Sequence, residues 1–252
     1  MAELLINGIP TWYETIGSGH EDVVLLHGGL SNSQVLSDVL APLSERYRVT
    51  SFDRRGHGRT PDSPEDFHYE SMADEVIAVL EHLGTRAHLI GLSDGGVVAL
   101  ITAQRRPELV DRLVLIGGNF HFDGLAQFEL EPDEPAVALL VSEYAARSPD
   151  GPEHFGVVAE KTSAMWGREP TMTQDDISRI SAPTLVLVGD DDAIRLDHTV
   201  ALYEALPNGQ LCVVPGASHF LPIEQPEETL KVLLRFLDSN SHPETMFPIR
   251  RK

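Results

Sequence analysis

The stretch HLIGLSDGGVVAL, residues 88–100, places Ser93 and Asp94 between two apolar runs, with glycines on both sides. The first run is typical of a buried strand, and the second continues as a helix. The spacing Gly91-x-Ser93-x-Gly95 matches G-x-S-x-G, which holds a serine on a sharp strand-to-helix turn. Gly91 and Gly95 suit this turn because side chains would clash where strand and helix meet. The motif predicts an exposed catalytic serine, with an ordinary Gly-Ser turn as the alternative.

The pattern of apolar runs separated by helix-like segments extends over most of the chain. These runs are continuous rather than alternating, which is typical of parallel strands covered on both faces. Near the N-terminus, Asn7-Gly8 predicts an antiparallel hairpin. One intervening helix is expected to begin at Ser71 and to end at Gly84. The predicted fold class is α/β, with a mostly parallel, doubly wound sheet of about eight strands and an antiparallel N-terminal hairpin. The runs are VVLL from Val23, YRVTSF from Tyr47, AHLI from Ala87, LVLI from Leu113, TLVLV from Thr184 and LCVV from Leu211.

Residues 120–177 interrupt this pattern. They contain helix-like pieces and a cluster of Glu, Asp and Pro, but no segment typical of a strand. The segment is too long for an ordinary connection and too short for an independent domain. We therefore expect a helical cap, or lid, inserted after the sixth strand, with residues 1–119 and 178–252 forming the α/β core.

The amino-acid composition limits the kinds of molecule that the protein is expected to bind. The 252 residues include 19 Lys and Arg against 39 Asp and Glu, a formal net charge of −20, which opposes binding to nucleic acid or to anionic membranes. The single cysteine, Cys212, cannot form an internal disulfide, which permits a reducing compartment. No signal peptide is evident, and no apolar run approaches the ~20 residues of a membrane span. We expect a cytoplasmic protein, a monomer or homodimer, that binds a small-molecule substrate.

Two further sets of candidates follow later strands of the predicted sheet. A serine hydroxyl is a weak nucleophile unless a base accepts its proton and a third group orients that base. Asp190, Asp191 and Asp192 come directly after TLVLV, and His219 follows LCVV. Because sites in open parallel sheets lie at the carboxyl ends of the strands, these side chains are expected near Ser93. The order Ser, Asp, His predicts nucleophilic catalysis, with a solvated turn as the alternative for the aspartates.

Five segments spread over nearly the whole chain strengthen this prediction. They are LLHGGLS from Leu25, SFDRRGHGRT from Ser51, GLSDGG from Gly91, GDDDAIR from Gly189 and PGASH from Pro215. Together they resemble the α/β-hydrolase superfamily. The resemblance implies Ser93 as the nucleophile, His219 as the base and Asp192 as the acid, because the family pattern G-x-x-D begins at Gly189. Asp190 has the same strand parity as Asp192 and remains a rival. No metal and no cofactor is expected.

An oxyanion hole needs two N–H donors at the place where negative charge develops. Asp94, the residue after the nucleophile, is expected to supply one from its backbone. By resemblance the other comes from the HGG loop, from Gly29, with Leu30 as the neighbouring alternative, while His27 and Gly28 shape the turn. The Asp94 side chain has two open interpretations. It pairs at the start of the helix, or it projects into the pocket, where it would select against anionic substrates or favour amines.

The segment FDRRGHG follows another strand and carries three candidate polar side chains, Arg54, Arg55 and His57. Structural ion pairing is the favoured interpretation for them, with a catalytic role as the alternative.

Apolar side chains are expected to line the substrate site. The predicted contacts are Leu30, Phe120, Phe122 and Trp166, with Phe155 and Met165 as further candidates from the cap. Packing in the core is the alternative for each of the cap residues.

The function predicted is hydrolysis of carboxylic esters of small to medium molecules through an acyl-enzyme intermediate. Three alternatives use the same scaffold. A carbon–carbon bond hydrolase would share the triad, but such relatives usually show H-G-S-G-P-G where this chain has HGGLSN. A cofactor-free perhydrolase or haloperoxidase would use peroxide in the second half-reaction. A small-molecule receptor would retain only vestigial hydrolysis. Epoxide hydrolases and haloalkane dehalogenases need an aspartate in place of Ser93.

Overall fold

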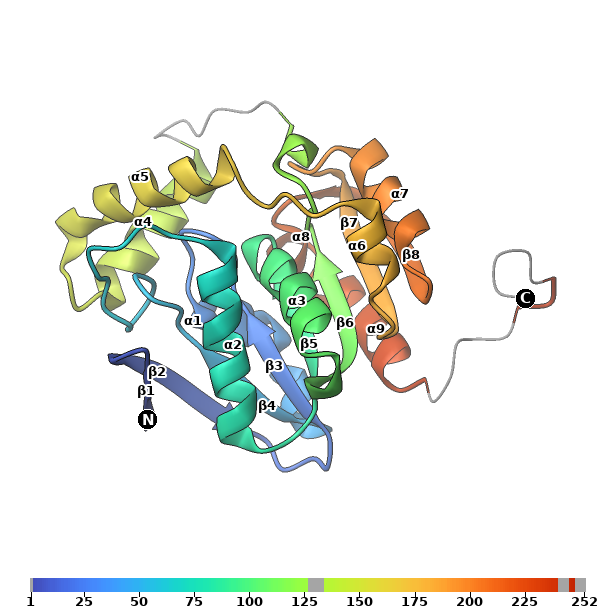
Figure 1. Ribbon diagram of the computed structural model, residues 1–252, viewed down its shortest axis with the longest axis horizontal. Coiled ribbons are helices and arrows are strands. Elements are labelled where there is room, and N and C mark those ends of the chain that lie inside the picture. Colours follow the sequence, from blue (N-terminus) through green and yellow to red (C-terminus); the bar gives the residue numbers. More distant parts are fainter. Residues whose placement is uncertain (1, 127–133, 240–244, 248–252) are drawn as a thin grey trace.

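A single eight-stranded sheet forms the centre of the molecule (Figure 1). The computed structural model describes residues 2–126, 134–239 and 245–247. The strand order is β1-β2-β4-β3-β5-β6-β7-β8, and all pairs from β4 to β8 are parallel. The predicted α/β fold with a mostly parallel sheet is confirmed. The strands are β1 (Ala2–Ile6), β2 (Ile9–Ile16), β3 (Asp22–Leu26), β4 (Arg48–Phe52), β5 (Ala87–Leu92), β6 (Val110–Ile116), β7 (Thr184–Asp191) and β8 (Gly209–Ser218).

The antiparallel part of the sheet is the predicted N-terminal hairpin. Asn7 and Gly8 have φ values of 51° and 83°, and Ile6 pairs with Ile9 across them. Positive φ at both central residues is the requirement of a type I′ turn, whose twist matches that of the flanking strands. The Asn-Gly pair therefore forms the hairpin, and β2 pairs antiparallel with β4 to join it to the sheet.

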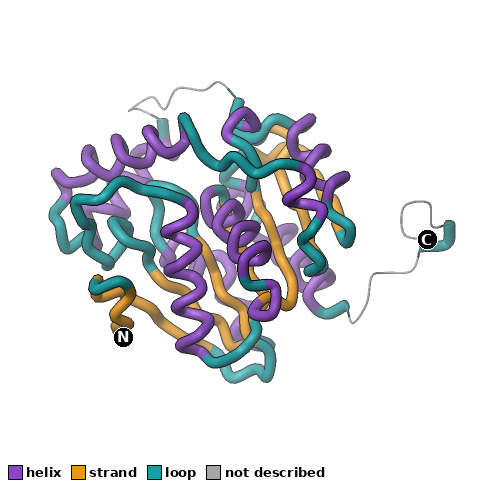
Figure 2. Tube along the Cα trace, viewed as in Figure 1, coloured by secondary structure: helices purple, strands orange, loops and turns teal. Residues whose placement is uncertain are grey.

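Helices cover both faces of the sheet, as Figure 2 shows in purple around the orange strands. One buried cluster combines side chains of α2, α3 and α7 with one face of the sheet, and a second combines α1 and α9 with the other face. All six residues of β5 are buried, which explains the continuous apolar run. The α-helices are α1 (Ser33–Leu40), α2 (Tyr69–Leu83), α3 (Asp94–Arg105), α4 (Pro135–Arg147), α5 (Phe155–Trp166), α6 (Gln174–Ser178), α7 (Leu196–Ala205), α8 (Leu221–Glu224) and α9 (Pro226–Leu237).

The start of α2 differs from the sequence-based expectation. The helix begins at Tyr69 with His68 as N-cap, not at Ser71, and it ends as expected at Gly84 in the left-handed conformation. The His68 side chain makes no capping bond. Instead the N–H of Tyr69 donates to Oε2 of Glu169 at 3.0 Å. A carboxylate one hundred positions away in sequence thus satisfies an N–H at the helix start, which local patterns do not reveal.

Between β6 and β7 the described residues form α-helices and no strand. In Figure 1, α4 and α5 lie side by side at one end of the molecule, beyond the carboxyl ends of the central strands. Helix α6 packs against α7 and α3 of the core instead. The division into a cap of residues 120–177 and a core stays a prediction; residues 127–133 of that segment lie outside the described part. Of the helices described, none combines the length and apolar composition that crossing a bilayer requires.

Candidate active site

Ser93 occupies a strained turn between β5 and α3. Its φ and ψ are 54° and −119°, a region that residues with side chains rarely adopt. A Cβ on Gly91 would overlap the carbonyl of Gly95, and a Cβ on Gly95 would overlap the carbonyl of Leu26. Both glycines are therefore required for the close approach of helix and strand. The turn holds the Ser93 hydroxyl at the carboxyl end of the central strand.

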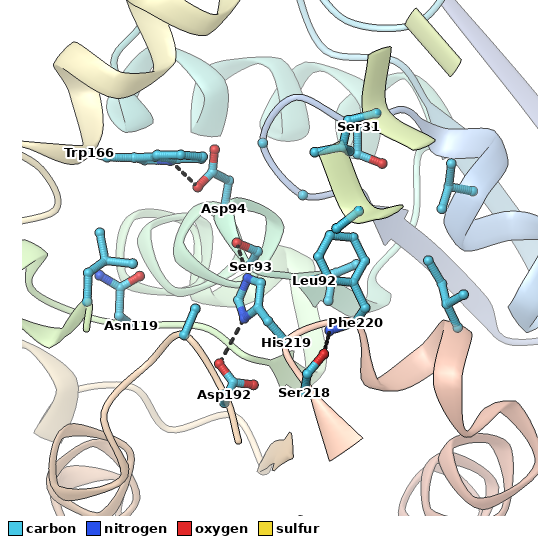
Figure 3. A pocket seen from close by; sticks show the side chains of 18 of the residues that line it. Ser31, Leu92, Ser93, Asp94, Asn119, Trp166, Asp192, Ser218, His219 and Phe220 are labelled. Atoms are coloured by element: carbon cyan, nitrogen blue, oxygen red, sulfur yellow. Dashed lines mark hydrogen bonds and ion pairs between the residues drawn. The ribbon is translucent and has the colours of Figure 1, made fainter. Parts of the chain in front are cut away.

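His219 joins Ser93 to Asp192 (Figure 3). Its Nε2 lies 2.9 Å from Oγ of Ser93, and its Nδ1 lies 2.8 Å from Oδ1 of Asp192. Asp192 Oδ1 also accepts the N–H of Ile194 at 2.9 Å, which fixes the carboxylate. When Nδ1–H donates to the carboxylate, Nε2 is free to accept the proton of the serine hydroxyl. The three predicted side chains thus lie within hydrogen-bond reach of one another, in the order that a nucleophile, a base and an orienting group require.

The neighbouring aspartates lie elsewhere. Asp190 Oδ1 accepts the N–H of Gly216 at 2.7 Å, and so binds the loop that leads to His219. Asp191 is exposed at the end of β7. Of the three aspartates, Asp192 is the one whose carboxylate contacts His219.

The backbone N–H groups of Asp94 and Gly29 are the candidates for the predicted oxyanion hole. Asp94 begins α3, so its N–H has no partner within the helix. Gly29 lies against the Asp94 side chain, and a Cβ on Gly29 would come within 2.8 Å of the indole of Trp166. Among the described residues, neither N–H donates a hydrogen bond to another residue. The N–H of Leu30 does, to Nε2 of His57 at 3.3 Å, so Gly29 rather than Leu30 has the free donor.

The Asp94 side chain is buried in the wall of the site, 3% exposed. Its Oδ1 accepts hydrogen bonds from the Tyr69 hydroxyl at 2.7 Å and from Nε1 of Trp166 at 2.9 Å. Its Oδ2 is buried without a partner among the described residues. Burial raises the pKa of this carboxyl, while Arg54 and the two donors act in the opposite direction. Asp94 therefore both pairs with neighbouring helices and presents a free acceptor beside the cavity.

The triad borders a cavity of about 540 Å³, a size typical of small-molecule sites. Trp166, one of the predicted substrate contacts, contributes to its wall. Among the described lining residues there is no Lys or Arg, whereas Asp94, Glu134, Asp191 and Asp192 are present. In the described part of the chain, His, Cys, Asp and Glu side chains form no group of three that could hold a metal ion.

The other predicted substrate contacts are not among the described residues that line this cavity. Leu30 and Met165 are buried in the hydrophobic core, and Phe155 packs against it. Phe120 is 7% exposed and stacks on His198 at a ring distance of 4.1 Å. Phe122 stacks on His121. Sequence reasoning missed the apolar contribution of α4, although Ala136, Leu139 and Leu140 follow a helical i, i+3, i+4 pattern that could have indicated it.

The polar segment after β4 is only partly an ion-pairing segment. Arg55 pairs with Asp62 at 3.3 Å, as expected. Arg54 forms no salt bridge among the described residues and binds main-chain carbonyls instead. His57 bonds to the backbone, and burial lowers its pKa to about 3. The expectation of ion pairs was wrong for Arg54 and His57, because they hold loops rather than charges.

Comparison with known proteins agrees with this geometry. The pattern that defines the alpha/beta hydrolase family matches residues 23–232. The chain is 26% identical to a putative esterase/lipase of Haemophilus influenzae, over 86% of this chain and 83% of that protein. It is 30% identical to the putative carbamate hydrolase RutD of Pseudomonas savastanoi pv. phaseolicola, over 87% of this chain and 95% of the relative.

A solved structure extends the comparison to the fold. The meta-cleavage product hydrolase of Pseudomonas fluorescens IP01 superposes with a TM-score of 0.75 at 23% identity, over 94% of this chain and 97% of the other. The family pattern over residues 23–232 and the 30% identity to the RutD relative show that the chain belongs to the alpha/beta hydrolase family.

Proposed function

We propose that this protein is a serine hydrolase that cleaves carboxylic esters of small to medium, uncharged molecules through an acyl-enzyme intermediate. The observation that carries the proposal is the position of His219, 2.9 Å from Ser93 Oγ and 2.8 Å from Asp192 Oδ1, at the wall of a mostly apolar cavity. Nucleophilic catalysis by serine needs these three roles in hydrogen-bond reach of one another.

In the first half-reaction, Ser93 Oγ attacks the ester carbonyl and its proton passes to His219 Nε2. Asp192 holds Nδ1–H and stabilises the imidazolium that forms. The N–H groups of Gly29 and Asp94 donate to the oxyanion of the tetrahedral intermediate, whose charge is greater than that of the ester carbonyl. The intermediate then collapses, the C–O bond breaks, and His219 returns its proton to the departing alcohol.

In the second half-reaction, water attacks the acyl-enzyme. His219 Nε2 takes one proton from the water, and the same N–H donors stabilise the second oxyanion. Collapse of this intermediate returns the proton to Ser93 and releases the carboxylic acid. The balance is one ester and one water consumed for one alcohol and one acid.

The charge of the cavity supports an uncharged substrate. Four acidic side chains and no described Lys or Arg line it, and the unpartnered Oδ2 of Asp94 lies beside Gly29. An anionic group next to the scissile bond would be placed near like charge without a cationic partner. A carbon–carbon bond hydrolase of an anionic ring-cleavage product would need such a partner, so the ester is the better match.

The test is a panel of p-nitrophenyl esters of increasing acyl length, with a thioester, a lactone and a carbamate added, assayed with wild type and Ser93→Ala. We expect the esters to be turned over and kcat of Ser93→Ala to fall on the order of 10⁶-fold. A fluorophosphonate should label wild type and not Ser93→Ala. Ser142→Ala, which removes an exposed hydroxyl on α4, is the matched control and should keep both activities. Labelling of Ser93→Ala, or a preference for the carbamate over every ester, would overturn the proposal.

A further inference from the structure

Arg54 is a fully buried guanidinium with an unusual set of partners. Its side chain is 0% exposed, yet none of the salt bridges among the described residues includes it. Nη1 donates to the carbonyl of His27 at 2.7 Å, and Nη2 donates to the carbonyl of Gly28 at 3.2 Å. A buried cation without a hydrogen-bonded ion pair is costly. The nearby carboxylates of Asp94, Glu75 and Asp53 favour the charged form, but the hydrogen bonds of the guanidinium go to the HGG loop.

The geometry of the peptide unit gives these bonds a consequence on the other side of the loop. The Gly28–Gly29 bond is trans, since the cis bond among the described residues is Glu169–Pro170. In a trans peptide the C=O and the following N–H point in opposite directions. When Arg54 binds the carbonyl of Gly28, the N–H of Gly29 must therefore point away from Arg54. Gly29 lines the cavity, so the fixed carbonyl directs this N–H toward the cavity.

His27 adds a second donor to the same carbonyl. Its Nδ1 lies 2.7 Å from the oxygen of Gly28, and its Nε2 accepts the backbone N–H of Arg54 at 3.1 Å. Because Nε2 accepts, Nδ1 carries the proton and the ring is neutral. Burial lowers the pKa of His27 well below its usual value, in agreement with the neutral ring. The carbonyl of Gly28 is thus held by both side chains.

The next peptide unit, Gly29–Leu30, is held by a different side chain, His57. The N–H of Leu30 donates to Nε2 of His57 at 3.3 Å, and Nδ1 of His57 lies 2.9 Å from the carbonyl of Arg55. Leu30 has a φ of 58°, so the chain turns sharply directly after Gly29. The loop is therefore held at the carbonyls before Gly29 and at the N–H after it. The N–H of Gly29, between these held points, has no hydrogen-bond partner among the described residues.

A cationic group that binds the C=O of a peptide unit also makes the N–H of that unit a stronger hydrogen-bond donor. Charge-assisted hydrogen bonds to the C=O polarise the peptide unit, and chains of hydrogen bonds reinforce one another in a low-dielectric interior. The Gly29 N–H therefore becomes a stronger donor to a developing oxyanion than an unpolarised amide would be.

We propose that Arg54, together with His27, positions and polarises the Gly28–Gly29 peptide, so that the N–H of Gly29 is held in place for the oxyanion. Arg54 is then a positioning residue that acts on the reaction through the backbone, and not a member of a salt bridge. The inference rests on the proposed function, because it assigns a task within the same acyl-transfer site.

The test compares a transition-state analogue with a ground-state analogue in wild type and Arg54→Lys. An aryl boronic acid forms a tetrahedral adduct on Ser93 whose oxygen occupies the oxyanion hole, whereas an ether of the same shape has no such oxygen. We expect Arg54→Lys to lower kcat for an ester by about 10²- to 10³-fold, with little change of KM. The Ki of the boronic acid should rise by a similar factor, and that of the ether should stay within about twofold. Equal weakening of both inhibitors, or an unchanged kcat, would overturn the proposal.

Arg55→Lys is the matched control. Arg55 is the adjacent arginine, but its guanidinium binds the segment around Asp62 and Ser63, so the variant should keep the wild-type ratio of the two Ki values. If Arg54→Lys does not fold, His27→Asn and His27→Leu address the same carbonyl. The amide of His27→Asn can still donate to Gly28, so it should retain kcat, whereas His27→Leu should lose it with KM preserved. Equal activity of the two would contradict the proposal.

The two proposals fail in different ways. The boronic acid reports on a tetrahedral adduct at Ser93 and not on the ester chosen. A wild-type protein that binds the boronic acid but hydrolyses no ester of the panel would overturn the proposed substrate class and still leave the Arg54→Lys comparison decisive.

Discussion

Nε1 of Trp166 donates a hydrogen bond of 2.9 Å to Oδ1 of Asp94, and this bond ties the last residue of α5 to the residue that directly follows Ser93. The Tyr69 hydroxyl, at the first residue of α2, donates to the same oxygen at 2.7 Å. Side chains of α2 and α5 thus meet on one buried carboxylate oxygen at the start of α3. The position of α5 over the cavity and the start of α3 are coupled through it.

Trp166→Phe should measure the strength of this coupling. The variant keeps an aromatic ring but removes the donor to a buried carboxylate, so the free energy of unfolding should fall by about 1.5–3 kcal/mol in urea denaturation. Trp12→Phe is a close control, because Nε1 of Trp12 is buried without a partner among the described residues. The free energy of unfolding of Trp12→Phe should decrease by a clearly smaller amount. Equal losses for the two variants would show that ring size and not the hydrogen bond matters.

Asp94→Asn should change selectivity for charge. The amide oxygen can still accept from Tyr69 and Trp166, while the unpartnered Oδ2 becomes an NH₂ donor and the negative charge is lost. The ratio of kcat/KM for a half-succinate ester to that for a butyrate ester should therefore rise at least about tenfold, a difference of about 1.4 kcal/mol. Both esters are assayed at constant ionic strength. An unchanged ratio would mean that Asp94 does not act on substrate charge.

The nucleophile turn was predictable because its motif is contiguous in the sequence. Gly91 is required by the nearby carbonyl of Gly95, and Gly95 by the carbonyl of Leu26 on the neighbouring strand, but both lie at fixed spacings from Ser93. The Asn7-Gly8 hairpin follows from the φ values of two residues. Local sequence patterns could not decide between Asp190 and Asp192. The pairing of β7 with β8 shifts register between Gly189 and Asp191, so the alternation of a regular strand does not continue to the aspartates.

The substrate contacts were the least predictable part, because apolar side chains fill both cores and cavities. Phe120 is as apolar as a residue of a binding site, yet it stacks on His198 beneath the surface. The role of Arg54 could not be predicted from the sequence either, since its partners are backbone carbonyls of a loop about 26 positions earlier in the chain. Such contacts depend on how β3 and β4 lie side by side, which residue types alone do not specify.

Asp192→Asn, compared with Asp190→Asn, should show which of the two aspartates orients His219. The amide cannot stabilise the imidazolium and favours the wrong tautomer of His219, so kcat for an ester should fall by about 10⁴-fold with Ser93 intact. Asp190→Asn is the matched control two positions away. Its Oδ1 accepts the N–H of Gly216, which an amide oxygen can also accept, so kcat should stay within a few-fold. A larger loss for Asp190→Asn would reverse the assignment.

Histidine 198 should make folding stability depend on pH. His198 Nε2 accepts the N–H of Phe120 at 3.2 Å, so the folded protein needs the neutral ring. Burial, with Arg195 as a further cause, lowers the pKa of His198 to about 4. The unfolded chain, with a pKa near 6.5, binds more protons between these values, so the stability that His198 contributes is present above about pH 6.5 and is lost as the pH falls toward 4.

Between pH 7 and pH 5 this loss should be on the order of 2 kcal/mol for one such group. His198→Gln keeps an acceptor for the N–H of Phe120 but does not titrate, so its free energy of unfolding should decrease less than that of wild type over the same range, measured by urea denaturation at each pH. His20→Gln removes an exposed histidine and should leave the wild-type slope. If His198→Gln and wild type lose stability in parallel, the ring is not the group that titrates.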